Sequence, residues 1–130
     1  MKKAILSFLL TFAVVGAWSA IKPARVYLCG FAASFNDSTV YFTDVQQVDS
    51  AYLDTKTKFL YSRDNYSYQL KEYLKGQNFT TPTCVTLFAT DRKKLEKKMA
   101  KMRKKYSNGK YIVKGIKAAD FTYEAIKYEE

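Results

Sequence analysis

Residues 91–106, DRKKLEKKMAKMRKKY, are compatible with only one kind of element. Their apolar side chains recur at the i, i+4, i+7, i+11 spacing of a single helix face: Leu95, Met99, Met102 and Tyr106. Lys and Arg occupy nearly all of the remaining surface, and Glu96 is the only acid after Asp91. Such a helix is stable only when its narrow apolar stripe is buried against another element. The segment therefore predicts a surface helix that begins at Thr90 or Asp91 and ends before Asn108-Gly109.

The basic face of this predicted helix has two interpretations. It keeps a small domain solvated, or it binds a polyanion such as nucleic acid, anionic lipid headgroups or an acidic polysaccharide. Like charges four residues apart destabilise a helix by roughly a few tenths of a kcal/mol per pair, so the crowding of cations has a cost. The candidate polyanion-binding residues are Arg92, Lys93, Lys94, Lys97, Lys98, Lys101, Lys104 and Lys105. Arg103 is the ninth cation of the helix and is not one of these candidates.

The first segment, MKKAILSFLLTFAVVGAWSA (residues 1–20), has the pattern of a secretory signal peptide. Two lysines precede an apolar run, and small residues offer cleavage after Ala17, Ser19 or Ala20. The alternative, a membrane anchor, requires about 20 consecutive apolar residues, and this run is shorter. We therefore expect a bacterial protein that is periplasmic or secreted, with no transmembrane segment after removal of the signal.

The rest of the chain predicts four strands and one further helix. The strands are expected over 25–35, 39–48, 84–89 and 111–116, and the helix over 64–75. Alternation of apolar and polar residues in 39–48 indicates a strand with one buried face. Residues 49–63 have no clear period and predict a long connection or an irregular strand, while 121–128 predicts another strand or an ordered tail.

The predicted order is β-β-α-β-α-β within residues 21–130, a length suited to one core. We predict a single small α+β domain. Its sheet is expected to be antiparallel or mixed and four-stranded, with the two helices on one face, because that arrangement buries every apolar face with few elements.

Composition excludes most familiar catalytic chemistry. The chain has no His, which removes Ser-His-Asp and Cys-His nucleophiles and imidazole acid–base catalysis. Two Cys are too few for a Cys₄ zinc site or an ordinary iron–sulfur cluster. We expect no cofactor and no metal, and a function other than catalysis.

The two cysteines, Cys29 and Cys84, each lie in a predicted strand. Export permits a disulfide between them, which would close a loop of about 56 residues and stabilise the fold by roughly 4 kcal/mol. The alternative is a pair of buried free thiols that act as small apolar side chains.

Tyrosine is unusually frequent, with 11 residues. A flat ring with a polar tip suits a stacking or sugar-binding surface. Tyr66, Tyr73 and Tyr106, however, fall on the predicted buried stripes of the two helices, so core packing explains several of the tyrosines without a ligand.

The predicted β-β-α-β-α order, with Tyr27 in the first strand and Tyr41 in the second, resembles the GIY-YIG nucleases in topology over residues 25–106. The defining motifs are replaced: V-Y-L-C stands where G-I-Y would, and V-Y-F-T where Y-I-G would. The resemblance implies metal-dependent phosphodiester cleavage, with Tyr27, Glu96, and Arg63 or Arg92 as the catalytic set.

The sequence thus favours an exported, non-catalytic binding or envelope-associated domain whose ligand it does not name. Its partner is expected to be an anionic envelope polymer or another envelope protein. Polyanion binding through the basic helix 91–106 is the first alternative, and a GIY-YIG-like nuclease is the second.

Overall fold

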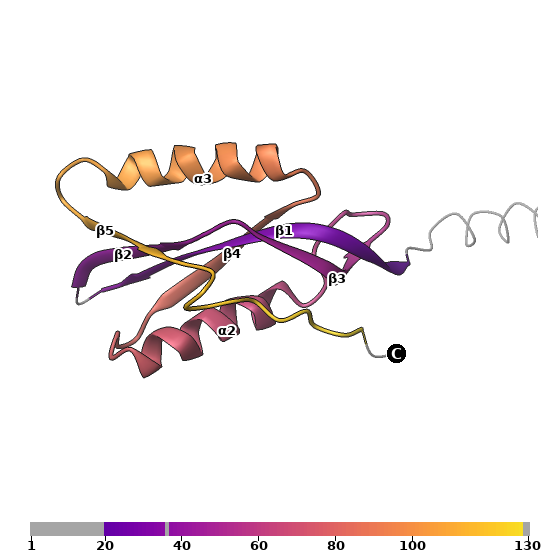
Figure 1. Ribbon diagram of the computed structural model, residues 1–130, viewed down its shortest axis with the longest axis horizontal. Coiled ribbons are helices and arrows are strands. Elements are labelled where there is room, and N and C mark those ends of the chain that lie inside the picture. Colours follow the sequence, from indigo (N-terminus) through magenta and orange to yellow (C-terminus); the bar gives the residue numbers. More distant parts are fainter. Residues whose placement is uncertain (1–19, 36, 129–130) are drawn as a thin grey trace, which may run out of the picture.

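The computed structural model describes residues 20–35 and 37–128 (Figure 1). The predicted signal peptide lies outside this part of the chain, except for Ala20. The elements are β1 (Ile21–Ser34), β2 (Asp37–Thr43), β3 (Gln46–Asp54), α2 (Arg63–Gly76), β4 (Thr83–Ala89), α3 (Arg92–Tyr106) and β5 (Ile112–Ile116). The described residues therefore form the single small α+β domain that the sequence predicts, with a mixed sheet of five strands where four were expected.

β1 is the central strand of the sheet. Phe31 in β1 is the partner of both Phe42 in β2 and Val85 in β4, so β2 and β4 lie on opposite edges of β1. β3 follows β2 along the same edge, and all three strands are antiparallel to β1. β5 extends the sheet beyond β2 as a parallel strand. The order across the sheet is therefore β4, β1, then β2 and β3 end to end, with β5 beside β2.

The two helices cover opposite faces of the sheet (Figure 1), not the single face expected from the sequence. The larger core lies on the α2 face and includes Val26, Leu28, Ala32, Tyr66, Leu70 and Leu74. A smaller core lies on the α3 face and comprises Phe31, Val40 and Phe42, with Met99, Met102 and Tyr106 packed on them. β1 contributes to both cores, because successive side chains of a strand point to opposite faces.

The segment predicted as one strand over 39–48 is two strands, because the chain leaves the sheet between β2 and β3; β3 then continues into the first part of the segment 49–63, which has no clear period. Its buried residues Val48, Ala51 and Leu53 are spaced by three and then two, because the pairing of β1 with β3 shifts register between Ala24 and Val26. The break between β2 and β3 is closed by a side chain: the Gly30 N–H donates to the Thr43 hydroxyl at 2.8 Å.

The C-terminal segment 117–128 is an ordered tail, not a strand, and it packs on the α2 face. Side chains take the place of a partner strand. Gln46 donates to the Phe121 carbonyl and accepts from the Tyr123 N–H, both at 2.8 Å. Further along, the Tyr66 hydroxyl accepts from the Ile126 N–H at 3.0 Å. The tail therefore completes the larger core with Phe121 and Tyr123.

Candidate polyanion-binding face

α3 begins and ends where the sequence predicts. Asp91 is its N-cap, and the carboxylate accepts a hydrogen bond from the Lys93 N–H at 3.0 Å. Leu95 is fully buried, and the Tyr106 ring lies 4.9 Å from that of Phe31. The predicted apolar stripe therefore attaches the helix to the sheet and leaves the rest of its circumference to solvent.

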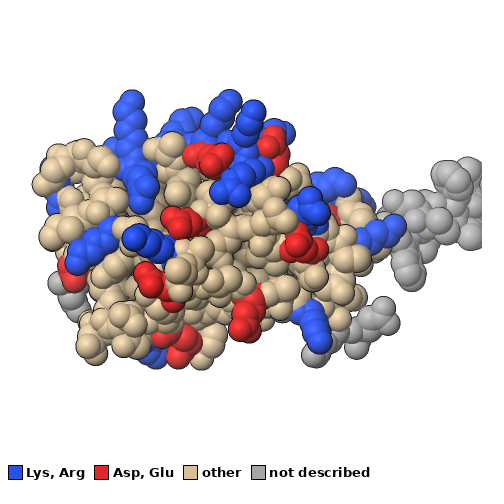
Figure 2. Space-filling model, in the orientation of Figure 1, with Lys and Arg blue, Asp and Glu red and all other residues tan. Residues whose placement is uncertain are grey.

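Helix geometry divides the cations of α3 into three rows. The outer row is opposite the apolar stripe and comprises Lys93, Lys97, Lys101 and Lys104. The β4 row, on the flank toward β4, comprises Lys94, Lys98 and Lys105. The β5 row, on the other flank, comprises Arg92 and Arg103, with Glu96 between them. Figure 2 shows Lys and Arg gathered over α3 at the top of the view.

All eight predicted polyanion-binding residues are exposed. Arg92 forms an ion pair with Glu96 at 3.7 Å, one helical turn away. Within residues 20–35 and 37–128, no carboxylate lies within ion-pair distance of the seven lysines in the outer and β4 rows. These ammonium groups are therefore held close together on one helix, and their charge is not neutralised by the domain itself.

Arg103 differs from the other cations of α3 because it is half-buried. Its guanidinium lies over the Phe42 ring, 5.2 Å from the centroid. A Cβ placed on Gly115 in β5 would lie 3.5 Å from Arg103 Nη2. Arg103 therefore contributes to packing between α3 and the sheet. It is not one of the eight candidate polyanion-binding residues, all of which are exposed.

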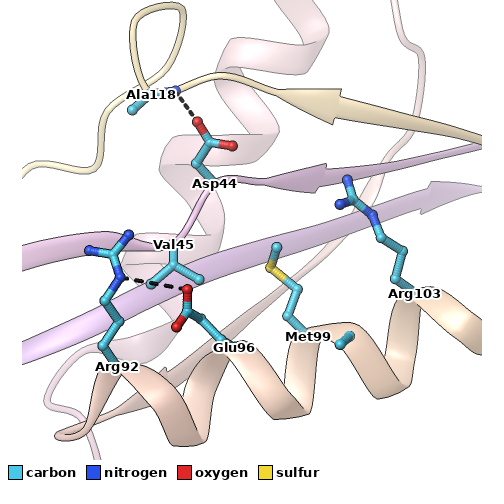
Figure 3. Close-up of a pocket in the computed structure, with 8 residues that line it drawn as sticks. Asp44, Val45, Arg92, Glu96, Met99, Arg103 and Ala118 are labelled. Atoms are coloured by element: carbon cyan, nitrogen blue, oxygen red, sulfur yellow. Dashed lines mark hydrogen bonds and ion pairs between the residues drawn. The ribbon is translucent and has the colours of Figure 1, made fainter.

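A groove of about 580 Å³ runs between the β5 row and the junction of β2 with β3 (Figure 3). Met99 and Ala100 line it, together with the Arg92–Glu96 pair. Across the groove, Asp44 accepts a hydrogen bond from the Ala118 N–H at 3.1 Å. The groove presents charges of both signs. Sequence gives no signal for it, because Asp44 and Ala118 are 74 residues apart.

A second hollow, of about 350 Å³, lies on the other flank of α3. Leu87 of β4 and Met102 form its apolar floor, and three lysines surround it: Lys98, Lys101 and Lys105. The charge here is of one sign, unlike that of the groove beside Arg92. The outer row and this flank therefore form the most strongly cationic part of α3.

The structure holds Cys29 and Cys84 as free thiols, which is the second of the two interpretations drawn from the sequence. They lie on adjacent strands, but the register pairs Cys29 with Leu87 and Cys84 with Ala32. An odd offset of three residues places the two side chains on opposite faces of the sheet, so the predicted disulfide does not form. Burial raises the pKa of the Cys29 thiol to about 12 and that of Cys84 to about 11.

Most of the tyrosines pack against other rings of the protein. Tyr66 is fully buried, Tyr73 lies 5.2 Å from the Phe121 ring, and Tyr106 contacts Phe31, as their places on the predicted stripes indicate. A separate group near the β3 end of the sheet comprises Tyr52, Tyr61 and Tyr128, with the last two rings 5.0 Å apart. The tyrosines therefore do not form one shared surface.

The structure brings together only part of the set that the resemblance to GIY-YIG nucleases implies. Alternation along β1 places Tyr27 on the α3 face with Phe31. Tyr41 lies on the α2 face, where its ring contacts that of Phe79 at 5.0 Å. Arg63 belongs to α2, and its Nε donates to the Thr86 carbonyl at 2.8 Å. Tyr41 and Arg63 therefore lie on the α2 side of the sheet. The other members of the set are on the α3 side, where Arg92 and Glu96 form an ion pair at 3.7 Å.

The described part of the chain contains no group of three or more His, Cys, Asp or Glu residues arranged to hold a metal ion. No helix in that part is long and apolar enough to cross a membrane. No family model, curated protein or solved structure matches the chain. Among the described residues, the surface of α3 is therefore the candidate functional site.

Proposed function

We propose that this protein is a non-catalytic domain that binds a polyanion through the outer and β4 rows of α3. The observation that carries the proposal is the absence, among the described residues, of any carboxylate paired with the seven lysines of those rows. Holding like charges together reduces helix stability, and an anionic ligand removes that cost. The same lysines are free to pair with phosphate, sulfate or carboxylate groups because their side chains are exposed.

The ligand is a surface or an extended polymer in this proposal. The outer row alone spans positions 93 to 104, which is about 16 Å along a helix axis. A single small anion would contact only one or two of these lysines. A repeating array of charges contacts several at once, and each contact releases counterions, so binding weakens steeply as salt rises.

The test compares two variants of equal net charge on heparin-agarose. One carries Lys→Gln at Lys93, Lys97, Lys101 and Lys104, and Gln has a helix propensity close to that of Lys. The control carries Lys→Gln at four exposed lysines outside α3: Lys22, Lys71, Lys117 and Lys127. We expect the α3 variant to elute at clearly lower salt than the control. Elution of both variants at the same salt concentration would show that net charge alone causes retention.

We also propose that the protein acts outside the bacterial cytoplasm, after removal of residues 1–20 or most of them. The proposal is supported by the apolar and small-residue pattern of that segment. β1 begins at Ile21, so cleavage at any of the three candidate sites leaves the sheet intact. Cell fractionation and the N-terminal mass of the recovered protein test it. Recovery of the intact chain from the cytoplasm would contradict it.

A further inference from the structure

Three large apolar side chains are exposed at one end of the sheet. Phe35, which directly follows β1, is 98% exposed. Tyr111 and Ile112, at the start of β5, are 42% and 55% exposed. The described residues contain six exposed large apolar side chains in all, so half of them are at this end.

Topology brings these residues together. β5 is parallel to β2 and pairs Ile112 with Thr39, close to the turn that joins β1 to β2 (Figure 1). Phe35 and Tyr111 line the same hollow of about 290 Å³, together with Tyr106 from the last turn of α3. The Tyr106 and Tyr111 rings are 5.0 Å apart. Phe35 and Tyr111 therefore share a hollow on the α3 side. Ile112 lies at the same end of the sheet, but its side chain is on the α2 side, because its neighbour Val113 packs on the α3-side core. We call Phe35, Tyr111 and Ile112 the apolar tip.

Phe35, the most exposed residue of the apolar tip, contributes little to the stability of the domain. A ring that is 98% exposed in the folded protein is exposed to nearly the same extent in the unfolded chain, so folding buries almost none of it. Exposed aromatic and aliphatic side chains that gather at one place typically mark an interaction site. The exposure of these side chains therefore indicates that a ligand outside the domain covers the tip.

Four lysines lie close to the apolar tip along the chain. Lys104 and Lys105 end α3, and Lys110 and Lys114 flank Tyr111 and Ile112; all four are exposed. The acid at this end is Asp37, whose carboxylate accepts a hydrogen bond from the Thr39 N–H at 2.9 Å. Proximity of that N–H, and of Lys114, lowers the pKa of Asp37. Positive charge therefore exceeds negative charge around the tip.

The combination of apolar and cationic groups identifies the ligand chemistry. Lysines attract an anionic surface, and apolar side chains among them enter the boundary between headgroups and acyl chains. Tyr is enriched at such boundaries because its ring is apolar and its hydroxyl is polar. A stacking ligand would contact the two aromatic rings, Phe35 and Tyr111. It would offer no apolar contact to the Ile112 side chain.

We propose that this end of the domain docks on an anionic phospholipid bilayer. Phe35, Tyr111 and Ile112 enter the interface, and Lys104, Lys105 and Lys110 contact headgroup phosphates. The inference goes beyond the proposed polyanion-binding function, because of the seven lysines in the outer and β4 rows it uses only Lys104 and Lys105, at the end of α3. In this orientation the β1–β2 turn faces the bilayer, and the strands of the sheet run away from the membrane surface.

The first experiment measures binding to vesicles by cosedimentation, with the protein in the form in which it accumulates in the producing cell. The vesicles contain phosphatidylglycerol in phosphatidylcholine, or phosphatidylcholine alone. We expect Phe35→Ser to weaken partition onto the anionic vesicles about tenfold, because the energy of burying the ring is lost. Phe59→Ser is the matched control: Phe59 is 68% exposed but lies in the loop between β3 and α2. It should bind as the unchanged protein does.

The second experiment locates the residue in the bilayer. Phe35→Trp and Phe59→Trp are each made together with Trp18→Phe, which removes the natural tryptophan. On phosphatidylglycerol vesicles we expect a blue shift of the emission and quenching by brominated lipid for the Phe35→Trp protein. The Phe59→Trp protein should show neither change, and neither protein should respond in this way to phosphatidylcholine alone.

The outcomes separate the inference from the proposed function. Retention on heparin without a blue shift at position 35 leaves polyanion binding in place and overturns membrane docking. A shift at position 35 on single-stranded polynucleotide, but not on vesicles, replaces the bilayer with a stacking ligand. If the protein binds neither heparin nor anionic vesicles, the proposed function itself is contradicted.

Discussion

The Tyr123 hydroxyl occupies the space that a side chain at position 30 would need. Gly30 lies in the middle of β1, and a Cβ built there would overlap the Tyr123 hydroxyl and come within 2.6 Å of Leu70 Cδ2. The tail and α2 therefore both approach the backbone of the central strand at this point. Gly30 permits the approach because it has no side chain, not because it has an unusual backbone conformation.

Gly30→Ala should lower the free energy of unfolding by about 1–3 kcal/mol, because the added methyl group forces the tail or α2 away from β1. Urea unfolding measures the loss. Adding Tyr123→Phe removes the hydroxyl that the methyl group meets, so the double variant should recover part of the stability. A Gly30→Ala protein as stable as the unchanged one would show that the tail does not pack as described.

Two buried tyrosines are expected to respond in opposite ways to loss of the hydroxyl. Tyr123 Oη is buried and has no hydrogen-bond partner among the described residues, whereas Tyr66 Oη accepts from the Ile126 N–H. Tyr123→Phe should be neutral or stabilise the domain by about 1 kcal/mol, and Tyr66→Phe should destabilise it by about 1 kcal/mol. Thermal and urea unfolding of the two variants, measured side by side, provide the comparison. Equal losses in both would contradict the assigned hydrogen bonds.

Gln46 should matter much more than its uncharged amide alone indicates. Gln46→Ala leaves the Phe121 carbonyl and the Tyr123 N–H without partners in a buried place, at a cost of about 2–4 kcal/mol. Gln69 makes a similar pair of bonds to Glu124 at a more exposed position, where water replaces the lost amide. Gln69→Ala is therefore the matched control and should cost less than about 1 kcal/mol. Hydrogen exchange at the Tyr123 amide should accelerate in the Gln46 variant only.

The free thiols lead to a prediction about labelling. Under non-reducing conditions the intact mass should correspond to two thiols, even in protein recovered from an oxidising compartment. Iodoacetamide should modify Cys84, which is partly exposed, faster than the buried Cys29, and both should react fully after unfolding. A mass that shows an intramolecular disulfide would require a different pairing of β1 with β4.

Stability should fall as the pH rises above about 9. The thiol pKa is 9.0 in an unfolded chain but about 12 for Cys29 and about 11 for Cys84 in the folded protein. Above pH 9 the unfolded chain therefore releases protons that the native state keeps, and the equilibrium shifts toward unfolding. Urea midpoints measured between pH about 8 and about 11 test this. Cys29→Ala should reduce the slope, and an unchanged slope would mean that Cys29 ionises freely in the folded state.

The basic helix was predictable because its pattern is local. Asp91 at the start, the four-residue stripe and Asn108-Gly109 at the end all lie within one stretch of sequence, and the helix forms as expected. The exposure of the lysines follows from the same pattern. The helix over 64–75 and the strand over 84–89 were predictable for the same reason, and they match α2 and β4 to within one residue at each end.

The features that the sequence did not reveal depend on distant residues. β3 was obscured because it has one extra residue between Val48 and Ala51 opposite β1, which breaks the alternation of its buried side chains. The continuous apolar run of β1 indicates a strand covered on both faces, whereas the predicted arrangement had both helices on one face. The partners of the tail lie far away in sequence: Gln46 is 75 residues from Phe121. The apolar tip has no local sequence pattern, because Phe35 and Tyr111 are far apart in the chain and come together only when β2 pairs with β5.

The tail that completes the larger core also determines when this chain can fold during its synthesis. A ribosome that has made residues 1–116 has produced every strand and helix, but not Phe121 or Tyr123, which fill the space between β1 and α2. Up to that point the central strand lacks its cover over Gly30, and the N–H of residue 123 that Gln46 binds has not been made. We therefore expect the larger core to close only when the segment up to residue 126 has been made.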